Sequence, residues 1–269
     1  MRRFPLFASL VALLCAAFFL VPLAATVNFS LRMRRGEISL DAYASVFRDD
    51  TFLSVLGFSA LASLAAIALG ALLVVPTAYW VRLRLPGLRP LTEFLSLMPL
   101  IIPPVVLVFG YVRIYGTASV LPLTMSEAGT NLLLVIGYTV LSLPYMYRAV
   151  DNGMAAIDIA TLTEAAESLG ASRLRTIATV IFPNVRSAIM SGAFLTFSIS
   201  LGEFVITSLL NRPAFGPYLV QMGQDYAYQP AALAIMAFAF TWACMALMDF
   251  FATRKPGQGL LPFLRRKSP

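Results

Sequence analysis

Six long apolar stretches, separated by shorter polar segments, dominate the pattern of the chain. They lie at about 6–29, 52–80, 91–115, 130–149, 187–210 and 230–252. About 18 apolar residues suffice to cross roughly 30 Å of hydrocarbon as a helix. Backbone polar groups cannot stay unpaired in lipid, and the alternating pattern of a β-barrel is absent, so each stretch should be helical. The pattern predicts an all-α integral membrane protein with six transmembrane helices.

The composition supports this prediction, since 59% of the residues are hydrophobic and 12% are charged, whereas a soluble domain usually carries about 25% charged residues. The first stretch follows Met1-Arg2-Arg3 and could be mistaken for a signal peptide. A cleaved signal has a shorter apolar core and a small-residue cleavage site, for which only Ala24-Ala25 is a candidate. We therefore expect the first stretch to be retained as a membrane helix.

Basic residues in the connecting segments predict the orientation, because they accumulate on the cytoplasmic side. With the N-terminus inside, the inner segments hold fourteen of the 20 Lys and Arg residues and the outer segments hold six. The cluster at 32–35 opposes this orientation, but the later inner segments outweigh it. Both termini are therefore predicted to be cytoplasmic, and contact with membrane lipid explains the net charge of +7. Tyr79 and Trp80, near the end of the second stretch, suit a membrane interface.

Several kinds of chemistry are excluded by the residues present. The chain has no histidine, so neither a Ser-His nor a Cys-His catalytic pair can form. Its two cysteines, Cys15 and Cys244, fall within predicted helices, which makes a zinc or iron–sulfur site improbable. No G-x-x-x-x-G-K-[ST] phosphate loop is present, so the chain cannot hydrolyse ATP by that means. No basic stripe is interleaved with aromatic residues, which argues against nucleic-acid binding. We predict no metal site, no cofactor and no catalytic residue on this chain.

The longest inner segment, about 148–186, carries more pattern than a simple connection requires. Thr161 to Glu164 resembles a capping box, in which the threonine caps a helix and the glutamate reaches back. Gly170 is placed to end this helix in a left-handed conformation. The expected apolar stripe has helical spacing and comprises Leu162, Ala165, Ala166 and Leu169.

A second short helix is expected to follow the glycine, with Pro183 ending it just before the fifth apolar stretch. Its apolar stripe comprises Leu174, Ile177, Ala178 and Ile181. One stripe can pack on the chain itself, but two stripes suggest that a partner docks from the cytoplasm. We call residues 158–183 the coupling segment.

The coupling segment resembles the EAA loop of bacterial binding-protein-dependent ABC importer permeases. The motif has Glu-Ala-Ala, three further residues, a glycine and an apolar run ending at a proline, and this spacing is matched by Glu164-Ala165-Ala166, Gly170 and Pro183. The resemblance implies a bacterial inner-membrane location. Phe182 replaces the usual leucine and Ile177 an aromatic residue. The resemblance implies a type I ABC importer transmembrane domain over 51–252, preceded by an N-terminal helix and periplasmic loop (1–50) and followed by a cytoplasmic tail (253–269).

The resemblance also implies a mechanism and partners. The surface that docks in a groove of a cytoplasmic ATPase would be formed by Glu164, Ala165, Ala166, Gly170 and Pro183. ATP and Mg²⁺ would bind to two such ATPase subunits. The other implied partners are a second permease subunit, identical or different, and a periplasmic solute-binding protein. The chain itself would be a non-catalytic transport subunit.

Two interrupted stretches are candidates for the substrate pathway. Pro103 and Pro104 break the third stretch, either to line a water-filled path or as a packing kink. In the fifth stretch, Glu203 would be costly in lipid unless it is paired or hydrated. It would either attract a cationic substrate, with Ser200 and with Gly202 allowing close backbone approach, or pair with a partner's arginine, or cap a broken helix.

The substrate suggested by resemblance is a polyamine or related organic cation, since the chain looks most like the second permease subunit of spermidine/putrescine importers. Related permeases move ferric iron, 2-aminoethylphosphonate or opine-like solutes, which remain alternatives. A secondary transporter would be a different class, but it should show internal repeats and several charges within the membrane. An EAA loop would not be expected in it.

Overall fold

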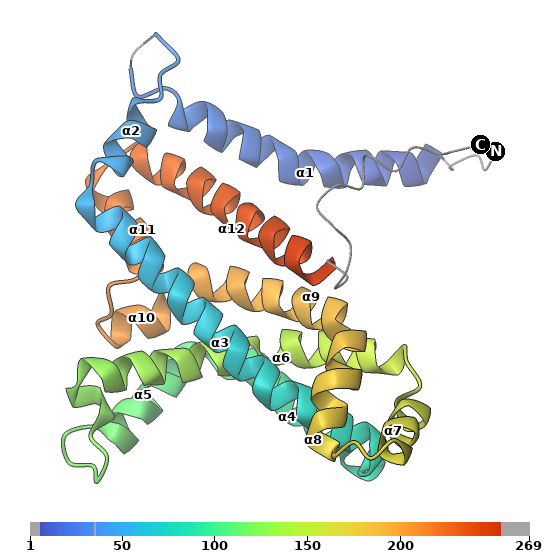
Figure 1. Ribbon diagram of the computed structural model, residues 1–269. Coiled ribbons are helices and arrows are strands. Elements are labelled where there is room, and N and C mark those ends of the chain that lie inside the picture. Colours follow the sequence, from blue (N-terminus) through green and yellow to red (C-terminus); the bar gives the residue numbers. More distant parts are fainter. Residues whose placement is uncertain (1–5, 35, 254–269) are drawn as a thin grey trace. The chain divides into compact units, whose positions relative to one another are not determined.

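The computed structural model describes residues 6–34 and 36–253, which form helices joined by turns (Figure 1). No strand occurs in these ranges. The predicted tail therefore lies outside the described residues except for Thr253, as do Arg2, Arg3 and Arg35. The helices are α1 (Leu6–Ser30), α2 (Asp41–Phe47), α3 (Asp50–Leu83), α4 (Arg89–Ile101), α5 (Pro104–Tyr115), α6 (Glu127–Ala155), α7 (Ile159–Ser168), α8 (Arg173–Thr176), α9 (Phe182–Leu201), α10 (Val205–Leu209), α11 (Phe215–Asp225) and α12 (Gln229–Thr253).

Five of the described helical runs are long and apolar enough to cross a membrane. They comprise Ser9–Ser30 of α1, all of α3, all of α6, the run Arg173–Leu201 that ends with α9, and Gln229–Met248 of α12. A sixth crossing is possible where α4, with the short turn that precedes it, continues into α5 at an angle of 96°. The all-helical membrane fold predicted from the sequence is therefore confirmed, with the third stretch bent and not straight.

Consecutive prolines explain the bend in the third stretch. A residue before proline is pushed out of the helical region toward extended conformations. Ile102 precedes Pro103, and Pro103 precedes Pro104, so both adopt extended ψ values, 118° and 141°. Helix α5 then starts at Pro104, where a missing N–H does no harm. Pro103 and Pro104 therefore break the helix as expected.

The chain divides into two compact units. The first comprises the described residues up to Ser59 together with Pro213–Phe240. Its core is formed by Val46, Phe52, Phe215 and Leu233. Polar contacts fix its turns, since the Tyr218 hydroxyl donates to Asp49 over 2.7 Å and the Phe215 amide donates to the Ser59 hydroxyl over 2.8 Å.

The second unit comprises Ala60–Arg212 and the described residues from Thr241 onward. Its core lies where the end of α3 meets α6, α7 and the run from α8 to α9. Small residues allow these helices to approach closely: a Cβ on Gly153 would lie 2.3 Å from the Cβ of Ala188, and one on Gly192 would lie 2.8 Å from the Met146 sulfur. Such close contact is the usual basis of helix association in membranes. This core supports the coupling segment.

Candidate functional site

Helix α7 begins one turn earlier than the sequence suggested. Asp158 is its N-cap, and the Asp158 carboxylate accepts hydrogen bonds from the Thr161 amide (3.1 Å) and the Thr161 hydroxyl (2.7 Å). These two hydrogen bonds, from the hydroxyl and then the amide, lower the pKa of Asp158. The predicted capping box is therefore wrong: Thr161 is already the third helical residue, and Glu164 lies in mid-helix, too far along to reach the cap.

The end of α7 confirms the role expected of Gly170. Its φ of +82° is in the left-handed region that favours glycine. The Gly170 amide donates to the Glu167 carbonyl (2.9 Å), and the Ala171 amide donates to the Ala166 carbonyl (3.0 Å). This pair of bonds is a Schellman motif, which satisfies carbonyls at a helix end and turns the chain.

The buried face of α7 differs from the predicted stripe. Ile159, Thr163 and Ala166 are buried, and Leu162 packs against the core beside them. Ala165 and Leu169 are exposed instead, Leu169 to 89%, and Glu164 is exposed as well. The predicted apolar stripe is therefore divided: Leu162 and Ala166 lie toward the core with Ile159, whereas Ala165 and Leu169 do not. The outer face thus leaves Glu164, Ala165 and Leu169 exposed.

Pro183 does not end the second helix, as the sequence had suggested. Helix α8 continues through a π-helical turn, η3 (Ile177–Ile181), directly into α9. A proline inside an α-helix collides with the carbonyl four residues earlier. The π turn just before Pro183 is wider than an α-helical turn, which avoids this collision. The Asn184 side chain donates to the Val180 carbonyl in the same region (2.8 Å). The coupling segment is therefore continuous with a membrane helix.

The last turns of α3 hold the coupling segment in place, which the sequence did not reveal. The Tyr79 hydroxyl lies 3.1 Å from the Thr163 hydroxyl, both side chains being buried. Tyr79 is 1% exposed, so its ring packs inside the protein. The available signal was the spacing of Val75, Ala78, Tyr79 and Arg82, which places them on one helix face.

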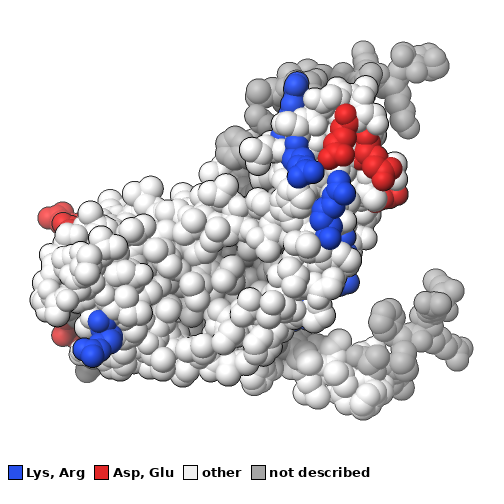
Figure 2. Space-filling model, turned by 90° about the horizontal axis from the view of Figure 1, so that it is seen from below, with Lys and Arg blue, Asp and Glu red and all other residues white. Residues whose placement is uncertain are grey.

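A charged link lies one turn further along α3. The Arg82 Nε is 2.5 Å from Oδ1 of Asp151 on α6, and the Arg89 guanidinium is 3.5 Å from Oδ2 of the same carboxylate. The Asp151 side chain is only 9% exposed, so its charge requires such partners. On the face that Figure 2 shows, most of the surface carries no charge, and the basic and acidic side chains gather in limited areas.

Glu203 caps a helix after a break in the fifth apolar stretch. Helix α9 ends at Leu201, and the carboxylate of Glu203 accepts from the amides of Ile206 (2.9 Å) and Thr207 (3.1 Å) at the start of α10. This geometry matches the helix-cap alternative for Glu203 and shows that 187–210 is not one uninterrupted span. A Cβ on Gly202 would meet nothing within 4 Å, so no described residue of the chain itself requires a glycine there.

The structure brings the two interrupted stretches together. Helix α10 packs against α5, which begins at Pro104. Both meet Gly137 of α6, where an added Cβ would lie 3.1 Å from the Ile206 side chain and 3.8 Å from Leu107. Ser200, 1% exposed, has a hydroxyl without a hydrogen-bond partner among the described residues. The residues expected to line a pathway thus gather in one region of the second unit.

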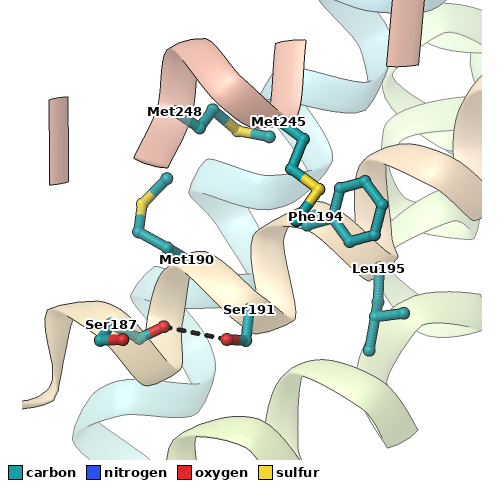
Figure 3. Close-up of a pocket in the computed structure, with 7 residues that line it drawn as sticks. All are labelled: Ser187, Met190, Ser191, Phe194, Leu195, Met245 and Met248. Atoms are coloured by element: carbon teal, nitrogen blue, oxygen red, sulfur yellow. Dashed lines mark hydrogen bonds between the residues drawn. The ribbon is translucent and has the colours of Figure 1, made fainter. Parts of the chain in front are cut away.

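A cavity of about 320 Å³ lies elsewhere in the same unit, between α9 and α12 (Figure 3). Its lining comprises Ser187, Met190, Ser191, Phe194, Leu195, Met245 and Met248. The polar members of this lining are two serines, and the Ser191 hydroxyl already donates to the Ser187 carbonyl (3.1 Å). A polar solute would find few groups to orient it there. In the described part of the chain, no three His, Cys, Asp or Glu residues gather to form a metal site.

Residues 77–254 match the family described as binding-protein-dependent transport system inner membrane component. A probable molybdenum ABC transporter permease of Haloferax volcanii is 33% identical over 156 residues, covering 56% of this chain and 54% of that protein. The probable ABC transporter permease y4fN of Sinorhizobium fredii is 30% identical, covering 88% and 44% respectively. The spermidine/putrescine permease PotB of Escherichia coli is 27% identical, covering 60% of each. The chain spans about half the length of the first two of these relatives.

Solved structures show the same fold. The chain superposes on a bacterial ABC transporter involved in the import of alginate with a TM-score of 0.70, at 15% identity, covering 92% of this chain and 94% of that one. This likeness confirms the predicted ABC importer transmembrane fold. The family confirms a multi-pass inner-membrane chain and a permease instead of an enzyme, while its relatives name different solutes. The chain therefore belongs to the binding-protein-dependent transport system inner membrane component family.

Proposed function

We propose that this chain is the membrane-spanning permease subunit of an ATP-driven ABC importer and forms half of its translocation pathway. The observation that carries the proposal is the two-sided coupling segment. One face of α7 is buried against α3 and α6 of the same chain, and the opposite face leaves Glu164, Ala165 and Leu169 exposed. A large exposed leucine beside a charged residue on a docked helix suits a protein partner.

The partners follow from the same proposal. ATP and Mg²⁺ bind to two cytoplasmic ATPase subunits, whose grooves receive Glu164, Ala165 and Leu169. Ala166, expected on the docking surface, is buried against the chain itself, while Gly170 and Pro183 shape the segment. A second permease subunit, identical or different, completes the pathway, and a periplasmic solute-binding protein delivers the solute. An alginate ABC transporter has been solved in complex with its substrate-bound periplasmic protein, which supports this last partner by analogy of fold.

The solute proposed first is a polyamine or related organic cation. Spermidine/putrescine permeases are among the relatives, and Glu203 places a carboxylate at the break in the fifth stretch. The third and fifth apolar stretches meet near this break. The residues proposed to line the pathway lie in these two stretches and are Pro103, Pro104, Ser200 and Gly202. Because Glu203 already caps α10, its charge is partly engaged, which weakens the attraction for a cation.

A second candidate is molybdate, an oxyanion. Two different molybdenum permeases, from Haloferax volcanii and Escherichia coli, are 33% and 34% identical to the aligned part of this chain. Ferric iron is a third candidate, since a ferric permease of Actinobacillus pleuropneumoniae is 28% identical over 235 residues. Uptake of radiolabelled spermidine, molybdate and ferric iron into cells that lack and then regain the chain distinguishes these solutes.

The proposed function is tested by substitution on the exposed face of α7. Leu169→Asp should abolish copurification of the ATPase subunits and ATP-driven uptake, because it places a charge in the docking surface. Leu88→Asp changes another exposed leucine, 45% exposed, outside the coupling segment and serves as the control. Normal ATPase binding and uptake by Leu169→Asp would contradict the proposal.

A further inference from the structure

The end of α3 is joined to three different helices within four residues. Tyr79 hydrogen-bonds Thr163 of α7, the Arg173 guanidinium of α8 lies 5.3 Å from the centroid of the Trp80 ring, and Arg82 pairs with Asp151 of α6. Each contact is specific: a side-chain hydrogen bond, a cation–π contact and an ion pair.

From this arrangement we propose that Tyr79 is a positioning residue that ties the coupling helix to α3, so that a displacement of α7 is delivered to α3. The inference rests on the proposed function, since it concerns how motion of a docked ATPase would enter the membrane domain. Tyr79 acts through Thr163 and touches no substrate.

Burial makes the Tyr79–Thr163 link resistant to separation. Tyr79 is 1% exposed and Thr163 is 2% exposed, so water cannot replace either hydroxyl's partner if the two helices part. An unpaired hydroxyl in such surroundings is unfavourable, which keeps the two helices together during movement. Helices joined in this way shift as one body.

Packing around the hydrogen bond adds stiffness. Val75 and Ala78 on α3, and Ile159 and Leu162 beside Thr163, belong to the same apolar cluster as Tyr79. Close-packed interiors are hardly compressible and transmit displacement. Helix α3 itself runs without interruption from Asp50 to Leu83, passing through Pro76. A push on α7 is therefore passed to a long continuous helix and not absorbed in a loop.

The structure supplies a matched control for the hydroxyl of Tyr79. Tyr147 belongs to the same cluster, and its hydroxyl lies 2.9 Å from the Thr92 hydroxyl. This second tyrosine hydrogen bond joins α6 to α4 and does not involve the coupling segment. Tyr79→Phe and Tyr147→Phe thus each remove one buried hydroxyl, but only the first loosens α7 from α3.

The test uses the full transporter, with its ATPase and binding protein, in proteoliposomes, and measures ATP hydrolysed per molecule of solute imported. The probe is radiolabelled spermidine or molybdate, whichever the wild-type complex carries. Tyr79→Phe should raise this ratio at least threefold, and Tyr147→Phe should leave it unchanged. Thr163→Val should raise the ratio as much as Tyr79→Phe does, and the variant with both changes should raise it no further than either single change. Thr163→Ser keeps the hydroxyl and should keep the wild-type ratio.

Three results would overturn the inference: a wild-type ratio in Tyr79→Phe, an equal rise in Tyr147→Phe, or additive losses in the double variant. If Tyr79→Phe does not assemble, Thr163→Val decides alone, since it leaves the tyrosine ring packed. Absence of ATP-driven uptake by the wild-type complex would instead overturn the proposed function. If the wild-type complex imports solute and Tyr79→Phe uses the same amount of ATP per molecule imported, only the role of Tyr79 would be overturned.

Discussion

Arg82 and Asp151 form an ion pair of 2.5 Å between α3 and α6, although 69 positions separate them in the chain. The side chains are 18% and 9% exposed, so neither charge is fully hydrated. Asp151 also lies 3.5 Å from the Arg89 guanidinium. The carboxylate therefore balances two cations next to the coupling segment.

Asp151→Asn should destabilise the purified protein, because it leaves Arg82 without its charge partner. The free energy of unfolding should fall by about 3 kcal/mol, the lower end of the range for a broken buried ion pair, because Arg82 keeps some hydration. Thermal unfolding in detergent measures the effect. Glu93→Gln, which removes an i,i+4 pair with Arg89 whose side chains are about half exposed, should change stability by less than about 0.5 kcal/mol. Equal stability of Asp151→Asn and wild type would show that the pair contributes little.

Gly170→Ala should weaken the end of α7, because its φ of +82° is unfavourable for a residue with a Cβ. The strain should be about 1–2 kcal/mol, and ATPase copurification and uptake should fall together. Gly87→Ala is the control: a Cβ at either glycine meets nothing within 4 Å, but Gly87 has no positive φ. A similar loss in both variants would rule out backbone conformation as the cause.

Asp158 makes a prediction for pH. Its pKa in the folded protein is lowered by the hydrogen bonds from Thr161, so the cap stabilises α7 above the ordinary carboxyl pKa of about 4 and is lost as pH falls below it. Between pH 5 and 8 the carboxylate stays ionised, so its contribution to the protection of α7 from hydrogen exchange should be complete and should not change with pH. Asp158→Asn should retain protection there, because asparagine also caps well, and Asp158→Ala should lose it. Protection in Asp158→Ala equal to that in wild type would contradict the assigned cap.

Glu203 should act as a helix cap in variants. Glu203→Ala leaves the Ile206 and Thr207 amides without their acceptor, a loss of about 1–3 kcal/mol, whereas Glu203→Gln keeps one acceptor oxygen and most of the stability. Ser200→Ala, which removes a buried hydroxyl with no described partner, should not destabilise. Thermal unfolding checks all three. Equal spermidine uptake by wild type and Glu203→Gln would count against a cation-attracting role.

The orientation can be decided at Val120, which is 98% exposed between α5 and α6. We expect cytoplasmic termini, so this position faces the periplasm only if the bent pair α4–α5 crosses the membrane. Alkaline phosphatase fused there should be active, and green fluorescent protein fused to the C-terminal end should fluoresce. The opposing cluster at 32–35 is partly neutralised, since Arg34 pairs with Asp41 and Arg32 donates to Asn28 (2.7 Å). An inactive phosphatase at Val120 would favour a re-entrant α4–α5 and five crossings.

The sequence predicted that the coupling segment contains a short helix, but it misplaced where its helices begin and end. Spacing alone identified a short helix ended by Gly170, because a left-handed cap is a local requirement. It misplaced the cap by three residues, since Thr161 and Asp158 are both good capping residues and only the course of the backbone selects Asp158. It also ended the second helix at Pro183, because a π turn that accommodates proline has no distinct composition.

The amino-acid pattern was sufficient to predict a helical membrane protein with a short glycine-ended helix and proline breaks at Pro103 and Pro104. These features depend on local quantities: apolar length, the missing proline N–H and the φ angle open to glycine. Only the tertiary structure decided that Tyr79 bonds Thr163, that Arg82 pairs with Asp151 and that Glu203 caps α10. The first two contacts join residues 84 and 69 positions apart. The cap depends on where α9 breaks, and packing between helices chooses that place.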